Sequence, residues 1–134
     1  MRIQLTVTEG PAKGRTFDFD EPNMFMFGRA PDAHCPILTD LGISRRHFLL
    51  QFNPPECTLL DLKSSNGTRV NNTWYGGKRG DVPPQFQWRD VETVRLKHGD
   101  LIVAGQSHFN LSVKYDLLCG GCGTRYTIEG DVGK

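Results

Sequence analysis

The 134-residue sequence lacks long hydrophobic runs, a surplus of charge of either sign and any helical hydrophobic periodicity. No apolar run approaches the ~18–20 residues of a membrane span, and the N-terminal segment MRIQLTV alternates instead of forming a signal-peptide core. We therefore expect a cytoplasmic protein that does not bind membranes. The chain has 16 Lys and Arg residues and 15 Asp and Glu residues, so we expect no broad positive field that would attract nucleic acid.

Cysteine is also scarce, with four residues in the chain. Cys35 and Cys57 stand singly and are most simply free thiols, which agrees with a reducing compartment. Cys119 and Cys122 have the spacing of one zinc knuckle, but neither Cys nor His follows them. They could be half of a zinc ribbon or part of a flexible tail. Apart from zinc held there, we expect no cofactor.

What the sequence has in abundance is turn residues, with 15 Gly and 8 Pro between short segments of β-like alternation. Strand patterns recur at 3–8, 15–19, 24–27, 47–52, 58–62, 68–70, 93–96, 101–104 and 108–115. No segment keeps a 3.6-residue apolar period over three turns. Many short strands at this spacing predict an all-β fold, a β-sandwich of two mostly antiparallel sheets.

Two stretches do not fit a minimal sandwich. Residues 73–91 form an insertion that is longer than most structureless loops and that carries two Trp, one Tyr and one Phe. It could fold over its own sandwich or provide a contact surface, and strand direction predicts that it lies at the end of the sandwich opposite the motifs described next. Residues 117–134 follow the last expected strand. We therefore expect one domain over 1–116, with the insertion at 73–91, and a tail over 117–134.

Three polar clusters follow apolar runs: Gly28-Arg29, Ser44-Arg45-Arg46-His47 and Ser64-Ser65-Asn66-Gly67-Thr68. Each is predicted to lie in a loop at a strand end, where a rigid scaffold can direct donors toward a ligand. Residues 24–80 contain seven basic and four acidic residues, a net +3, whereas the remainder of the chain is −2. A compact anionic ligand suits this distribution.

The order GR, SxxH, NG on a β-rich chain resembles the forkhead-associated (FHA) domain, an FHA/SMAD-like sandwich that binds phosphothreonine peptides with loops at one end. The resemblance covers residues 2–115. It implies that the phosphopeptide ligands are Arg29, Ser44, Arg45, Ser65 and Asn66, with Ser44 donating both its hydroxyl and its backbone N–H. It further implies that Gly28, His47 and Gly67 support the site. Asn66-Gly67 is also a strong hairpin-turn signal by itself.

The implied function is a signalling module that binds a phosphothreonine-containing protein or peptide and is part of a larger chain such as a Ser/Thr kinase or effector. A phosphate-independent scaffold module of the same fold is the alternative. Ser44 and His47 look like a nucleophile and its base, but neither a GxSxG elbow nor an orienting acid accompanies them, so we expect no enzyme activity.

Overall fold

The computed structural model describes residues 1–77, 85–90, 92–118 and 125–129, and these contain strands but no helix. The strands are β1 (Arg2–Glu9), β2 (Thr16–Phe19), β3 (Asn23–Gly28), β4 (Cys35–Pro36), β5 (Phe48–Asn53), β6 (Glu56–Asp61), β7 (Thr68–Val70), β8 (Thr73–Tyr75), β9 (Gln87–Arg89), β10 (Thr93–Arg95), β11 (Leu101–Ala104), β12 (Ser107–Leu118) and β13 (Arg125–Glu129). Among these residues, no helix has the length and hydropathy needed to cross a bilayer.

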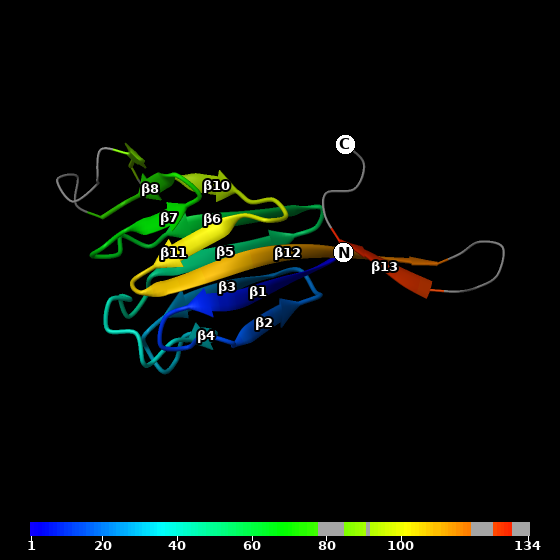
Figure 1. Ribbon diagram of the computed structural model, residues 1–134, viewed down its shortest axis with the longest axis horizontal. Coiled ribbons are helices and arrows are strands. Elements are labelled where there is room, and N and C mark those ends of the chain that lie inside the picture. Colours follow the sequence, from blue (N-terminus) through cyan, green and yellow to red (C-terminus); the bar gives the residue numbers. More distant parts are fainter. Residues whose placement is uncertain (78–84, 91, 119–124, 130–134) are drawn as a thin grey trace.

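The strands form two sheets that pack face to face (Figure 1). One sheet has the order β2-β1-β12-β11-β7-β8-β9, with β13 also paired to β12, and the other has the order β10-β6-β5-β3-β4. All pairs are antiparallel except β3 with β4 and β8 with β9. The predicted all-β sandwich is therefore confirmed.

The core between the sheets follows from the alternation of apolar residues along the strands. In β1, Ile3, Leu5 and Val7 are buried while their neighbours face outward. At the centre, the rings of Phe27 and Phe48 stack with their centroids 4.6 Å apart. Burying one such side chain contributes roughly 1.5–3 kcal/mol, so the ends of β3 and β5, where these rings lie, are well anchored. Those ends carry the first two motifs.

The insertion at 73–91 contains two strands that the sequence did not predict. A tight turn at Asn71-Asn72 joins β7 to β8, and Asn71 adopts the left-handed backbone conformation (φ 52°) that such hairpins use. Because the pair is antiparallel, β8 runs back along β7. β9 then pairs with β8 in parallel and extends the same sheet.

The C-terminal end of the sandwich also extends further than the sequence pattern indicated. β12 runs through the predicted boundary between 116 and 117 to Leu118, and β13 pairs with it from Glu129 to Arg125. The last strand of the predicted domain thus continues into the predicted tail. Cys119 and Cys122, the predicted zinc ligands, lie outside the described residues.

Candidate functional site

The three motifs meet at one end of the sandwich. The backbone N–H of Arg29 donates to the carbonyl of Ser44 (3.0 Å), and the N–H of Ala30 donates to Arg45 O (3.1 Å), so the end of β3 is paired with the β4–β5 loop. Gly28 makes this pairing possible, because a Cβ at this position would overlap the carbonyl oxygen of Arg45. The predicted supporting role of Gly28 thus has a steric explanation.

His47 joins the second motif to the third. It is fully buried, its Nδ1 accepts the N–H of Ser44 (2.9 Å), and its Nε2 lies 2.8 Å from Gly67 O. An N–H donor requires an unprotonated Nδ1, so the proton is on Nε2, which donates to Gly67 O. Burial lowers the pKa of His47 below its ordinary value, although the Gly67 carbonyl and the nearby Asp61 and Asp40 act in the opposite direction. His47 is therefore a neutral link between two loops.

Ser44 differs in one respect from what its family resemblance implies. Its backbone N–H is engaged by His47, so it is not directed at a ligand. Its hydroxyl oxygen accepts the N–H of Ser65 (3.0 Å), which leaves the hydroxyl hydrogen to donate elsewhere. Ser44 is half-buried at the surface of the loop. The side chain, and not the main chain, is the available donor.

Arg29 and Asn66 are exposed, yet each is held by one hydrogen bond to a carbonyl of the β4–β5 loop. Arg29 Nε donates to Ile43 O (3.2 Å), and Asn66 Nδ2 donates to Gly42 O (2.9 Å). The Arg29 bond uses one of five guanidinium N–H groups, so the terminal nitrogens carry the other four. The Asn66 bond fixes the plane of the amide and hence the direction of its Oδ1. The other predicted ligands, Arg45 and Ser65, have exposed side chains on the same loops.

Asn66-Gly67 does not form the hairpin that its sequence suggests. β6 and β7 belong to different sheets, so this segment crosses from one sheet to the other. Gly67 still needs its glycine, because its φ is 78° and a Cβ would lie 3.0 Å from Tyr75 O.

Two buried carboxylates, which the sequence reasoning missed, hold the loops in place. Asp61 accepts from Ser64 N (3.1 Å), Ser64 Oγ (2.5 Å) and Thr68 Oγ1 (2.7 Å), and so supports the third motif from inside. Asp40 accepts from Gly42 N (2.9 Å), Gln106 N (2.9 Å) and Ser107 Oγ (2.6 Å).

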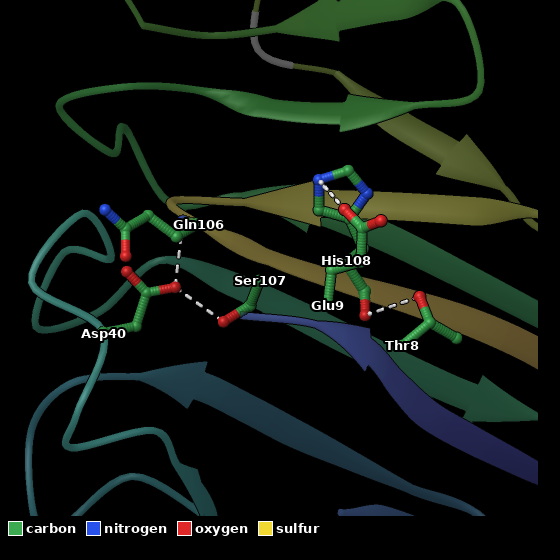
Figure 2. Close-up of polar contacts among 6 residues, drawn as sticks. All are labelled: Thr8, Glu9, Asp40, Gln106, Ser107 and His108. Carbon is green, nitrogen blue, oxygen red and sulfur yellow. Dashed lines mark hydrogen bonds and ion pairs between the residues drawn. The ribbon is translucent and has the colours of Figure 1, made fainter. Parts of the chain in front are cut away.

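Figure 2 shows the Asp40 carboxylate between the β4–β5 loop and the start of β12. Asp40 and Asp61 are 0% and 1% exposed, and such burial requires hydrogen-bond partners. The sequence could have indicated the role of Asp61. It is an acidic residue inside an apolar strand pattern and stands three residues before Ser64, a spacing that allows a local side-chain hydrogen bond.

The comparisons with known proteins agree with this arrangement. The family model described as FHA domain matches residues 25–105, more than half of the chain, and this range includes all three motifs. The chain belongs to the FHA domain family.

Individual relatives show the same similarity. The FHA domain-containing protein FhaA of Mycobacterium tuberculosis is 34% identical over 103 residues, which cover 75% of this chain and 17% of FhaA. The glycogen accumulation regulator GarA of Mycolicibacterium smegmatis is 39% identical over 67 residues, which cover 50% of this chain and 41% of GarA. The chain thus matches less than half of the length of either relative.

A similar solved structure comes from a structural and functional analysis of phosphothreonine-dependent FHA domain interactions. It superposes with a TM-score of 0.60 at 28% identity and covers 83% of this chain and 95% of its own. The FHA fold and the order of its loops are therefore shared along most of the described residues.

The insertion of this FHA domain does not lie where the sequence reasoning placed it. The prediction put it at the end opposite the motifs, but β8 returns toward them, and a Cβ on Gly77 would lie 2.9 Å from Gly67 N and 3.0 Å from Asn66 C. The Trp88 indole N–H donates to Gly76 O (2.8 Å) and ties β9 to the same corner. The prediction was wrong because it followed the direction of β7 without the hairpin at Asn71.

The geometry of Ser44 and His47 is not that of a nucleophile and its base. The imidazole Nδ1 accepts from the backbone nitrogen of Ser44, and Nε2 donates to a carbonyl, so neither nitrogen is available to take a proton from the Ser44 hydroxyl. The free thiols of Cys35 and Cys57 are buried, and burial raises the pKa of each to about 12. They are protonated at neutral pH and poor nucleophiles.

Proposed function

We propose that this FHA domain recognises phosphothreonine in a partner protein and acts as a binding module, not as an enzyme. The observation that carries the proposal is the convergence of Arg29, the Ser44 hydroxyl and Asn66 on one surface, each fixed by a hydrogen bond to the loop backbone. Donors that are already held in place lose little conformational entropy when they bind a ligand.

The donor set suits a phosphate monoester. Phosphothreonine carries a charge of about −1.5 to −2 and three acceptor oxygens, and it needs several charge-assisted donors in fixed directions. Arg29 would supply a planar pair of N–H groups, and Ser44 an O–H. Arg45 and Ser65 would contribute further donors from the neighbouring loops, while Asn66 Oδ1 would accept a backbone N–H of the bound peptide.

The relatives support a signalling role. FhaA is an FHA domain-containing protein, and GarA is a glycogen accumulation regulator. A solved relative comes from an analysis of phosphothreonine-dependent FHA domain interactions. The chain spans 17% and 41% of those two proteins. We propose that it is the recognition part of a larger cytoplasmic signalling chain, such as a kinase or another effector.

The alternative is a phosphate-independent scaffold that uses the same fold. Such a scaffold has no need for Arg29 or the Ser44 hydroxyl, whereas this chain has both, and His47, Asp61 and Asp40 are arranged to hold their loops. A surface preorganised in this way favours phosphate recognition.

A degenerate phosphothreonine peptide library, followed by calorimetry on the selected peptide and its unphosphorylated form, tests the proposal. We expect Arg29→Ala to lose about 2–5 kcal/mol of binding free energy, because the phosphate loses a charge-assisted partner. Arg46→Ala is a matched control, since Arg46 is an exposed arginine two residues after Ser44 with no predicted contact to the ligand. Equal loss in both variants, or equal binding of the unphosphorylated peptide, would contradict the proposal.

A further inference from the structure

A hollow of about 480 Å³ lies between the β1–β2 turn and the segment that leads from β4 into the β4–β5 loop. Figure 1 shows β2 and β4, the edge strands of the two sheets, next to each other at this place. Arg15, just before β2, closes the gap between them by donating from Nη1 to Pro36 O in β4 (2.9 Å). Pro11, Lys13, Pro36, Leu38 and Thr39 complete most of the lining.

The wall of the hollow is apolar and leads onto an apolar loop. Leu38 is 54% exposed, and Leu41, three residues further along the same loop, is 84% exposed. Among the described residues, the only other large hydrophobic side chain with such exposure is Met24, near the beginning of β3. Two of these three exposed apolar side chains are thus on the loop that presents Ser44.

The charged groups that line the hollow are both positive. Lys13 is exposed on the β1–β2 turn, and the Arg15 guanidinium is held in place by its bond to Pro36 O and by its position over the Phe17 ring, 4.8 Å from the ring centroid. An arginine that is already positioned binds a carboxylate at a lower entropic cost than a mobile one. The charge of the hollow therefore complements acidic residues.

The hollow is close enough to the phosphate site for one peptide to reach both. Pro36 is paired in register with Gly28, the last residue of β3, and Arg29 follows Gly28 directly. Paired strands are about 4.8 Å apart, so with side-chain lengths the hollow lies on the order of 10–15 Å from the Arg29 guanidinium. An extended peptide rises about 3.3 Å per residue and covers this distance in roughly three to five residues.

We propose that the hollow binds the segment that flanks the phosphothreonine in the partner protein, and that it selects an apolar residue with one or two acidic neighbours. The apolar side chain packs against Leu38 and Pro36, and the carboxylates face Lys13 and Arg15. This inference rests on the proposed phosphothreonine binding. It adds a second determinant, lined by Lys13, Arg15, Pro36 and Leu38, that chooses among phosphothreonine sequences.

The test is a peptide library with a fixed phosphothreonine and six degenerate positions on each side, screened against the wild-type protein and two variants. Leu38→Ser removes the apolar wall, and Lys13→Glu reverses one charge while Arg15 keeps its structural bond. Met24→Ser and Lys97→Glu are matched controls, because both residues are exposed and lie outside the hollow. Retained binding of phosphothreonine shows that each variant is folded.

We expect the wild-type protein to enrich an apolar residue and adjacent Asp or Glu about three to five positions from the phosphothreonine, and we expect Leu38→Ser and Lys13→Glu to lose this enrichment. For the best peptide, each variant should bind about tenfold more weakly, and the controls should bind as the wild type does. Phosphothreonine binding without enrichment at these positions, or enrichment that survives in both variants, overturns the inference alone. Absence of any phosphothreonine-dependent binding overturns the proposed function as well.

Discussion

Replacing His47 with alanine tests how the two recognition loops are held together. The imidazole is fully buried between Ser44 and Gly67, and it satisfies one backbone donor and one backbone acceptor. Alanine leaves both groups inside the protein without their partner. The side chain also contributes packing, since its ring lies edge-on to Phe48 at 6.3 Å between centroids.

The magnitude follows from these contacts. A buried polar group left unsatisfied costs about 1–3 kcal/mol, so two such groups and the cavity together should cost roughly 3–5 kcal/mol of the free energy of unfolding. For a chain of 134 residues this corresponds to a melting temperature lower by about 10–20 °C. Peptide affinity should fall as well, because the Ser44 loop loses its anchor.

Urea unfolding and calorimetry with the selected phosphothreonine peptide measure the two effects. His98→Ala is the control, because His98 also accepts one backbone N–H, from Val113 (3.0 Å), on a turn that is not part of the site. It should cost only about 1 kcal/mol and leave affinity unchanged. A His47→Ala protein that melts within 2 °C of the wild type (about 0.5 kcal/mol) would refute the reasoning.

Three further predictions follow from the same contacts. Burial lowers the pKa of His47, so as pH falls the unfolded chain protonates this imidazole at a higher pH than the folded chain does. The free energy of unfolding of the wild type should therefore decrease as pH falls below 6.5, and it should decrease less steeply in His47→Ala. Identical slopes for the two proteins in urea titrations from pH 5 to 8 would argue against a neutral His47. Gly28→Ala places a methyl group against Arg45 O and should destabilise the protein by about 1–3 kcal/mol or more while weakening phosphopeptide binding, as thermal melts and calorimetry would reveal. Gly77→Ala should disturb the Asn66 loop and lower peptide affinity. Gly99→Ala, which also has a positive φ but open space around it, should affect stability alone; equal affinities in the two variants would count against contact between the insertion and the site.

Much of the fold was predictable because its causes are local in sequence. The period-two alternation of Ile3, Leu5 and Val7 reflects burial on one face of a strand, and that pattern is visible without coordinates. The order of the three motifs likewise identified the loops that meet at the site. Their convergence also requires that β3, β4 and β6, the strands before them, run in the same direction, as their pairings show.

The features that were missed depend on contacts between distant residues. Asp40 meets Gln106 and Ser107, which are more than 60 positions away, and nothing near Asp40 in the sequence announces those partners. The engagement of the Ser44 N–H by His47 is a matter of side-chain geometry that the SxxH spacing does not specify.

The insertion was misplaced for a related reason. A single hairpin at Asn71-Asn72 reverses the chain, and the direction of everything after it changes with that turn. The Asn66-Gly67 pair predicted a hairpin from a local preference for a turn. The turn instead connects β6 to β7, which belong to different sheets, and the sequence pair does not distinguish these two cases.

The most direct test of the central claim is a nuclear magnetic resonance titration with a short phosphothreonine peptide that has alanine at every other position. The account predicts that the backbone signals of Ser44, Ser65 and Asn66 and the Nε signal of Arg29 shift in proportion to binding, while the signals of the Lys97–Gly99 turn stay in place. The same peptide without phosphate should leave all of them unchanged. Equal shifts with the unphosphorylated peptide, or shifts confined to other parts of the sandwich, would contradict phosphothreonine recognition at this site.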